Sequence, residues 1–162
     1  MFSAPMRLIM STACHPVFSR CVSYLLTGSI PNSNPTTKFF TVNHVKSDDI
    51  EDAHHTSAKY PKEISEFDKT KFKAEYLDGF IAPYVKGSNV RFGCKYLNEY
   101  DIKENNTILV VASIEHLYVD EKSIGEDGWI RLDKAKTVTI NGLDGYAETK
   151  LIDRFKYARP KK

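Results

Sequence analysis

The stretch from Val90 to Val119, VRFGCKYLNEYDIKENNTILVVASIEHLYV, decides the fold class. Two long segments in it, Val90–Tyr100 and Thr107–Val119, alternate in polarity and are rich in β-branched and aromatic residues, as β-strands are. The segment Lys103–Asn106 (KENN) between them has the composition of a tight turn. The stretch therefore predicts a long antiparallel β-hairpin.

The second of these strands is apolar on both faces. Its apolar residues divide between the two sides of the pleat, Ile108, Val110, Ala112 and Ile114 on one and Leu109, Val111 and Leu117 on the other. The interior of a barrel covers one of these faces, so the other needs a helix or a second subunit. This pattern predicts a dimer.

Upstream of the hairpin, Lys38–Val45 (KFFTVNHV) alternates and predicts another strand. Ser47 then has the character of a helix N-cap, with Asp48 and Asp49 in the first turn, and Pro61 ends the predicted helix. Farther along the chain lie predictions of a helical turn at 65–68 and of short strands at 129–132 and 137–140. The predicted fold is mainly β, a small closed or partly closed antiparallel barrel with one or two helices.

The size, charge and cysteine content of the chain argue against several classes of function. The chain has 162 residues, with 23 Lys and Arg against 21 Asp and Glu, so it is one near-neutral domain by size and charge. Balanced charge argues against a nucleic-acid partner, and no apolar run reaches the ~18 residues of a membrane span. Cys14, Cys21 and Cys94 form neither a disulfide framework nor a metal motif, so reduced thiols and a cytoplasmic location are expected.

The N-terminal part differs from the rest. Residues 1–36 contain Arg7 and Arg20 and no acidic residue, so we divide the chain into an atypical segment, 1–36, and a domain, 37–162. Within the segment, 11–35 shows no period and predicts poor order without a regular element. A transit peptide, a loose tail and a stretch foreign to the domain are three open interpretations.

Common catalytic and nucleotide-binding motifs are absent. The sequence has no G-x-G-x-x-G, no P-loop, no G-x-S-x-G and no H-E-x-x-H. No acid–base pair, nucleophile or metal site stands out, and Cys94 has the setting of a core thiol. An enzyme of this sequence would need another way to hold a cofactor.

The run His54–Tyr60 (HHTSAKY) is the densest polar cluster. It is either a solvated helix end or a site for a phosphate or a heterocycle, because hydroxyls and an ammonium group suit such a ligand. Asn106 is either a turn residue or a ligand contact. Tyr146, after Gly145, is either a packed aromatic or a neighbour of a flat ligand.

Several ordered runs together resemble one known family. They are FFTVNHV (39–45), AHHTSAKYPKEISEFDKT (53–70), APYVKGSNVRFGCKYLNEYDI (82–102), NNTILVVASIEHLYV (105–119) and TVTINGLDGYAETKLIDRFKYARP (137–160). In this order they are similar to the flavin reductase-like, FMN-binding split-barrel family. The resemblance covers 38–160.

This resemblance implies a six-stranded antiparallel Greek-key split barrel, a homodimer, and FMN near the dimer interface. It implies a flavin reductase that transfers hydride from NAD(P)H to flavin, with the chemistry supplied by the cofactors and no catalytic side chain required. At the positions where the quoted runs match the family, the resemblance implies six cofactor-binding residues. They are His55, Thr56, Ser57, Lys59, Asn106 and Tyr146.

The chain departs from the family pattern at its N-terminus. After a strand-like run, Met6–Met10, relatives carry an R-P-x-T-type run for the FMN phosphate, and this chain does not. We therefore expect a barrel incomplete at its N-terminus, with FMN bound in the micromolar range or more weakly. The alternative function is a truncated, non-catalytic barrel that binds FMN weakly or serves only as a dimerising module.

Overall fold

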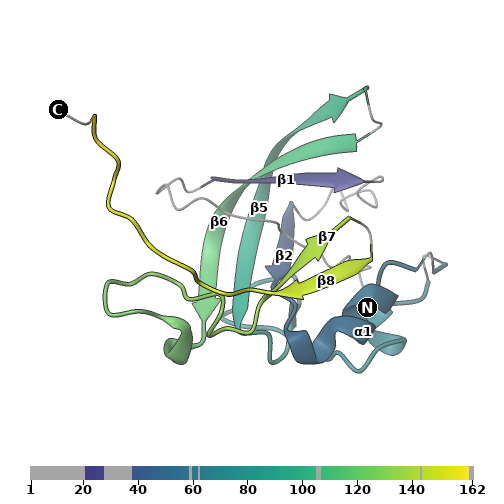
Figure 1. The fold of residues 1–162 in the computed structure, drawn as a ribbon. Coiled ribbons are helices and arrows are strands. Elements are labelled where there is room, and N and C mark those ends of the chain that lie inside the picture. The colour runs from purple at the N-terminus through teal and green to yellow at the C-terminus, as the bar shows by residue number, and fades with distance from the viewer. Residues whose placement is uncertain are drawn as a thin grey trace.

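A computed structural model describes residues 38–58, 60–61, 63–104, 107–142 and 144–160, and the backbone of Cys21–Thr27. The described chain consists mainly of antiparallel strands with one short α-helix at one end (Figure 1). The predicted fold class, mainly β with few helices, is confirmed. Within these ranges no helix has the length and apolar character needed to cross a membrane.

The main sheet is built around the predicted hairpin. Strands β5 (Val90–Ile102) and β6 (Thr107–Val119) pair along their whole lengths, and the sheet order is β1-β6-β5-β2, with β2 at Phe39–Asn43. The register shifts twice along the hairpin, between Gly93 and Cys94 and between Tyr96 and Asn98. Such bulges bend a strand, and both long strands curve strongly in Figure 1.

Two small hairpins complete the strands. Strand β3 (Ala74–Glu75) pairs with β4 (Tyr84–Val85), and β7 (Val138–Asn141) pairs with β8 (Gly145–Glu148). Beyond the end of β2, the carbonyl of Val45 accepts a hydrogen bond from the Val138 amide at 3.0 Å. This bond brings β7 and β8 beside the end of the main sheet.

Strand β1 corrects the prediction for the N-terminal segment. Cys21–Thr27 (CVSYLLT) pairs antiparallel with β6, from Cys21 opposite Ser113 to Thr27 opposite Thr107. The prediction that 11–35 contains no regular element is therefore wrong for this part. The stretch is too short to show a period, and its strand conformation follows from pairing with a long neighbour. The rest of 11–35 lies outside the described residues, and the division at residue 36 stays a prediction.

The predicted helix is present but begins differently. A 3-10 turn (Ser47–Asp49) leads into α1 (Ile50–His55), and Ser47 is not an N-cap. The 3-10 turn begins at Ser47 itself, which makes Lys46 the flanking residue, and the Ser47 amide donates to the Lys136 carbonyl at 3.0 Å. The predicted turn at 65–68 is confirmed as a 3-10 helix (Glu66–Asp68), with the Ser65 hydroxyl accepting from the Phe67 amide.

The strand predicted at 129–132 is absent. Here the Gly125 amide donates to the Trp129 carbonyl, and a single antiparallel bridge pairs Ile124 with Ile130. The turn at Gly125–Gly128 uses the neighbouring backbone groups, which leaves too few for a ladder. A third 3-10 helix, Glu121–Ser123, precedes this loop.

Two buried clusters hold the fold together. One joins α1, the loops and β7 through Val45, Ala53, Phe72, Val85 and Val138. The other lies on one face of the main sheet, at Val42, Cys94 and Ala112. Of the two apolar faces predicted for β6, the face with Ala112 is buried, whereas Leu117 on the opposite face is 48% exposed. The predicted dimer stays a prediction.

Candidate functional site

The C-terminal end of α1 meets β8. His54, on the helix, has its Nδ1 2.9 Å from the hydroxyl oxygen of Tyr146, and the two rings lie edge to face with centroids 5.8 Å apart. Tyr146 also packs against the cluster that contains Val45, and burial raises the pKa of its phenol. This contact joins two segments that the sequence analysis singled out separately.

His55 and Tyr60 form a second ring pair beside the first. Their Nε2 and hydroxyl oxygen are 2.5 Å apart, and the rings lie edge to face at 5.8 Å. His55 is exposed and Tyr60 is half-buried. Two imidazoles and two phenols therefore border the same helix end, a composition that suits a flat heterocycle with hydrogen-bonding edges.

The two hydroxyls at this end serve the helix itself. Thr56 Oγ1 donates to the Ala53 carbonyl and Ser57 Oγ donates to the His54 carbonyl, both at 2.7 Å. The same two carbonyls also accept from the amides of Thr56 and Ser57, at 3.2 and 3.0 Å, so each hydroxyl adds a second hydrogen bond at the end of α1. Thr56 is also buried, with 7% of its surface exposed, whereas Ser57 is exposed.

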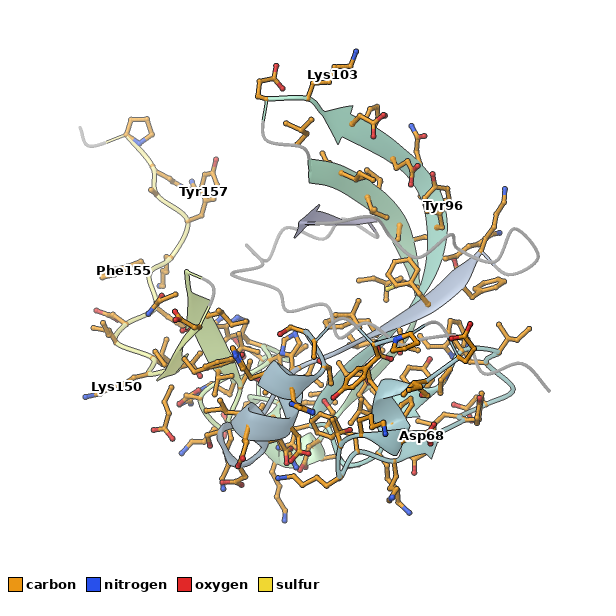
Figure 2. The ribbon with its side chains drawn as sticks, turned by 90° about the vertical axis from the view of Figure 1, so that its right-hand side faces the viewer. Asp68, Tyr96, Lys103, Lys150, Phe155 and Tyr157 are labelled. Carbon is orange, nitrogen blue, oxygen red and sulfur yellow. The ribbon has the colours of Figure 1, made fainter. Side chains whose placement is uncertain are left out.

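The structure brings four of the six predicted residues, His55, Thr56, Ser57 and Tyr146, to the end of α1. Lys59 and Asn106 lie outside the described residues. Lys103, near Asn106 in the sequence, lies at the tip of the β5–β6 hairpin, far from α1 (Figures 1 and 2).

A second polar group was not predicted from the sequence. Arg91 on β5 forms an ion pair with Glu75 at 2.5 Å, and its guanidinium lies 5.9 Å from the Tyr84 ring centre and 5.5 Å from that of Tyr118. The Tyr118 hydroxyl in turn donates to the carboxylate of Asp78. No pattern in the sequence indicated that β3, β4 and the loop between them supply the partners of Arg91 and Tyr118.

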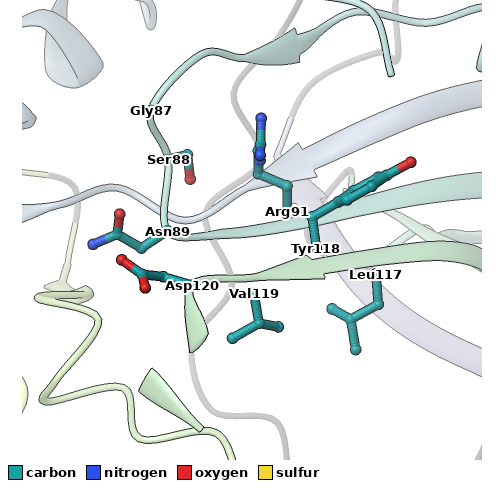
Figure 3. Close-up of a pocket in the computed structure, with 8 residues that line it drawn as sticks. All are labelled: Gly87, Ser88, Asn89, Arg91, Leu117, Tyr118, Val119 and Asp120. Carbon is teal, nitrogen blue, oxygen red and sulfur yellow. The ribbon is translucent and has the colours of Figure 1, made fainter. Parts of the chain in front are cut away.

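A pocket of about 420 Å³ lies beside this group (Figure 3). Its lining comes from the start of β5 and the end of β6, and consists of Gly87, Ser88, Asn89, Arg91, Leu117, Tyr118, Val119 and Asp120. Its one guanidinium is already paired with Glu75, and Asp120 adds negative charge. The pocket is therefore less suited to a phosphate than to a neutral polar group.

Cys94 and Tyr84 are buried in the fold and do not face a site. Burial raises the pKa of the Cys94 thiol to about 12, so it stays protonated at neutral pH and has the inert character expected of a core thiol. Burial also raises the pKa of Tyr84, whose hydroxyl has no hydrogen-bond partner within the described part of the chain.

A sequence model of the flavin reductase like domain matches residues 20–156. The match begins before Lys38, where the resemblance was expected to begin, and so includes all of β1. A search of curated proteins finds no match.

Solved structures agree with this match. A split-barrel protein of the flavin reductase type from Shewanella frigidimarina NCIMB 400 is 33% identical, with a TM-score of 0.76 over 85% of this chain and 71% of that one. Nitrilotriacetate monooxygenase component B from Bacillus cereus is 18% identical, with a TM-score of 0.68 over 84% and 71%. Flavoredoxin from Methanosarcina acetivorans is 15% identical, with a TM-score of 0.67 over 85% and 73%.

Proposed function

This chain belongs to the flavin reductase-like domain family, and from that premise we propose that it binds FMN and transfers hydride from NADH or NADPH to flavin. The observation that carries the proposal is the contact between His54 and Tyr146. It unites the HHTSAKY and GYA runs, which are far apart in the sequence, at one surface. The described residues there offer rings and hydrogen-bonding groups of the kind that a flavin ring system needs.

The fit to FMN differs between the two ends of the cofactor. For the ring system, His55 and Tyr146 supply one exposed imidazole and one half-buried phenol. For the phosphate, Thr56 fits poorly because its hydroxyl is buried and already donates to a carbonyl. We therefore assign the phosphate to Ser57, which is exposed and would have to turn its hydroxyl, and to Lys59.

A bound FMN would supply the acceptor for a hydride from reduced nicotinamide. The protein's own part is then to bind and orient. Tyr146 is held by the cluster around Val45 and by His54, so its ring has a fixed position from which to contact a flat ligand. No side chain is required to move a proton.

Two copies could bring the outer part of the β5–β6 hairpin to the end of α1. Within one copy Lys103, at the described end of that hairpin, lies far from α1 (Figures 1 and 2). A site that combined the two would therefore take the hairpin from one subunit and the helix end from another. This arrangement accords with a homodimer that binds FMN at its interface.

The alternative function is a non-catalytic barrel that binds FMN weakly or acts only as a dimerising module. One observation favours it: both hydroxyls assigned to the phosphate from the sequence donate to carbonyls of α1. Each charge-assisted hydrogen bond that a phosphate loses costs roughly 1.5 to 3 kcal/mol. Loss of two such bonds lowers the affinity by about two to four decades.

Titration with FMN, followed by quenching of flavin fluorescence, tests the proposal. We expect a dissociation constant in the micromolar range and NAD(P)H oxidation, followed by absorbance, that rises with added FMN. Binding without oxidation of either nicotinamide supports the non-catalytic alternative. Absence of binding at millimolar FMN overturns both.

A variant pair tests where the site lies. Ser57→Ala with Lys59→Ala is expected to weaken FMN binding at least about tenfold, because it removes a donor and a cation from the phosphate. The matched control is Ser113→Ala with Lys122→Ala, two residues far from α1 in the sequence and on other elements. Equal affinity in the two double variants shows that the site has been assigned to the wrong surface.

A further inference from the structure

The chain ends in an extended arm that carries large apolar side chains into solvent. We use the name C-terminal arm for Lys150–Pro160, which follows β8 and leaves the body of the molecule (Figure 1). Ile152, Phe155 and Tyr157 on the arm are 93%, 87% and 91% exposed. Three such side chains within six positions are costly to leave in water, and they mark a surface for a partner.

An ion pair and a ring contact tie the arm to its own body. Arg154 forms an ion pair with Asp127 at 2.8 Å, and its guanidinium stacks on the Trp129 ring at 4.2 Å. Among the described residues no backbone hydrogen bond joins the arm to the rest of the chain. Arg154 thus fixes where the arm leaves, while the backbone groups beyond it are free to pair.

The outer end of β5 offers an edge for such pairing. The last hydrogen bond on the β2 side of β5 runs from the Tyr96 amide to the Lys38 carbonyl at 2.7 Å. Beyond it, within the part of the chain that the structure describes, β5 pairs only with β6. We call the segment Leu97–Glu104 the outer edge. Leu97 and Tyr100 on it are 50% and 55% exposed, so it too displays apolar groups.

The charges of the two segments are opposite. The arm carries four basic residues and one acidic residue, Lys150, Arg154, Lys156 and Arg159 against Asp153. The outer edge carries three acidic residues and one basic residue, Glu99, Asp101 and Glu104 against Lys103. Opposite charge steers two surfaces together and fixes their register.

Within one copy these two segments lie apart. Figure 2 shows Phe155 and Tyr157 at the left, Tyr96 at the right on the curved hairpin, and Lys103 at the top. We propose that the C-terminal arm of one copy binds along the outer edge of β5 in a second copy. The exchange is reciprocal, as two-fold symmetry requires, and adds an extended segment beside the part of β5 that, among the described strands, pairs only with β6.

The first test removes the apolar groups of the arm. Sedimentation of the full chain over a range of concentrations gives the dimer dissociation constant. Phe155→Ala with Tyr157→Ala is expected to raise this constant at least about tenfold, because buried aromatics dominate such interfaces. The control, Tyr76→Ala with Ile81→Ala, removes two side chains that are 64% and 58% exposed elsewhere, and is expected to leave it unchanged.

The second test identifies the partner surface. Lys156→Glu with Arg159→Glu reverses the charge of two basic residues on the arm. Glu99→Lys with Asp101→Lys reverses the charge of two acidic residues on the outer edge. Each variant alone is expected to self-associate at least about tenfold more weakly, and a mixture of the two is expected to recover a heterodimer. Lys122→Glu with Lys134→Glu, which changes the net charge as the arm variant does, is the control and is expected to dimerise normally.

Three results overturn the proposal. They are a monomeric wild-type chain, a dimer that neither reversal weakens, and two weakened variants that do not recover on mixing. Circular dichroism of each variant shows whether the sheet is intact. FMN titration of the same samples is a separate readout, because the arm proposal does not depend on whether a flavin is bound.

Discussion

The imidazole of His54 and the phenol of Tyr146 meet at 2.9 Å across a junction between α1 and β8. This contact involves an exposed histidine and a half-buried tyrosine, so it combines local stability with access from solvent. The two segments come from distant parts of the chain, and their contact makes the end of α1 a candidate site and not merely the end of a helix.

Removal of the Tyr146 hydroxyl should show how much this junction contributes to the stability of the fold and how much to FMN binding. Tyr146→Phe loses one hydrogen bond and keeps the ring, so we expect a loss of about 0.5 to 1 kcal/mol in the free energy of unfolding. If the ring contacts a flavin through its phenol edge, FMN affinity also falls. Urea denaturation and FMN titration measure the two effects. Tyr76→Phe, at a side chain that is 64% exposed, should change neither the stability nor the affinity.

Gly93 and Tyr84 should show a steric coupling. A Cβ at Gly93 would collide with the Tyr84 hydroxyl oxygen and would lie 3.1 Å from the Phe80 ring. Gly93→Ala should therefore destabilise the fold by about 1 to 3 kcal/mol through overpacking. Tyr84→Phe alone should be neutral or stabilising, because the buried hydroxyl that it removes has no hydrogen-bond partner within the described residues.

The double variant tests that coupling. Gly93→Ala with Tyr84→Phe should be more stable than Gly93→Ala alone, because the closest contact is gone. Urea midpoints of the four proteins give the coupling energy. If the two changes in the free energy of unfolding simply add, the destabilisation by Gly93→Ala does not come from the Tyr84 hydroxyl. It then comes from the Phe80 ring or from the backbone.

Stability should fall in mild acid because of His44. Burial lowers the pKa of this imidazole from about 6.5 to about 4 in the folded chain. The unfolded chain therefore binds a proton first, and the free energy of unfolding decreases as pH falls from 6.5 toward 4, by at most about 1.4 kcal/mol per pH unit. His44→Gln should flatten this slope in urea denaturation across the range. An unchanged slope in His44→Gln would show that this imidazole is not the source of the acid sensitivity.

Arg91 and Arg154 should differ in their effect on stability, although both pair with a carboxylate and an aromatic ring. The Arg91 side chain is 17% exposed and Arg154 is 48% exposed. Arg91→Ala leaves Glu75 without its cation in a half-buried setting, so we expect a loss of about 2 to 3 kcal/mol. Arg154→Ala should cost less than about 1 kcal/mol, as exposed pairs do. Thermal or urea unfolding ranks the two, and equal losses would contradict this account.

The parts of the fold set by local pattern were predictable. The β5–β6 hairpin follows from two long alternating runs with a turn-like segment between them, and the run Ser65–Asp68 indicated the short helical turn that the structure has there. β1 was missed because its strand conformation depends on β6, which no local pattern in Cys21–Thr27 indicates. Ser47 is not a cap because the 3-10 turn already begins at this residue, which makes Lys46 the flanking position.

The candidate site was predictable only in part, for a related reason. The composition of HHTSAKY indicated a polar site, but it did not show that Thr56 and Ser57 use their protons within α1. Nor did it show that His54, and not its neighbour, reaches Tyr146. The group around Arg91 escaped prediction because its carboxylate, Glu75, lies on a two-residue strand with no periodic signal.

The position of β1 and β2 in the sheet has a consequence for synthesis. Both strands leave the ribosome before β5 and β6, their only described sheet partners, have been translated. Pairings between such distant segments form slowly, because a long loop must close before any contact stabilises it. The nascent chain therefore carries two unpaired strands until the β5–β6 hairpin is complete, and a chaperone that shields them would raise the yield of folded protein more than one that acts later.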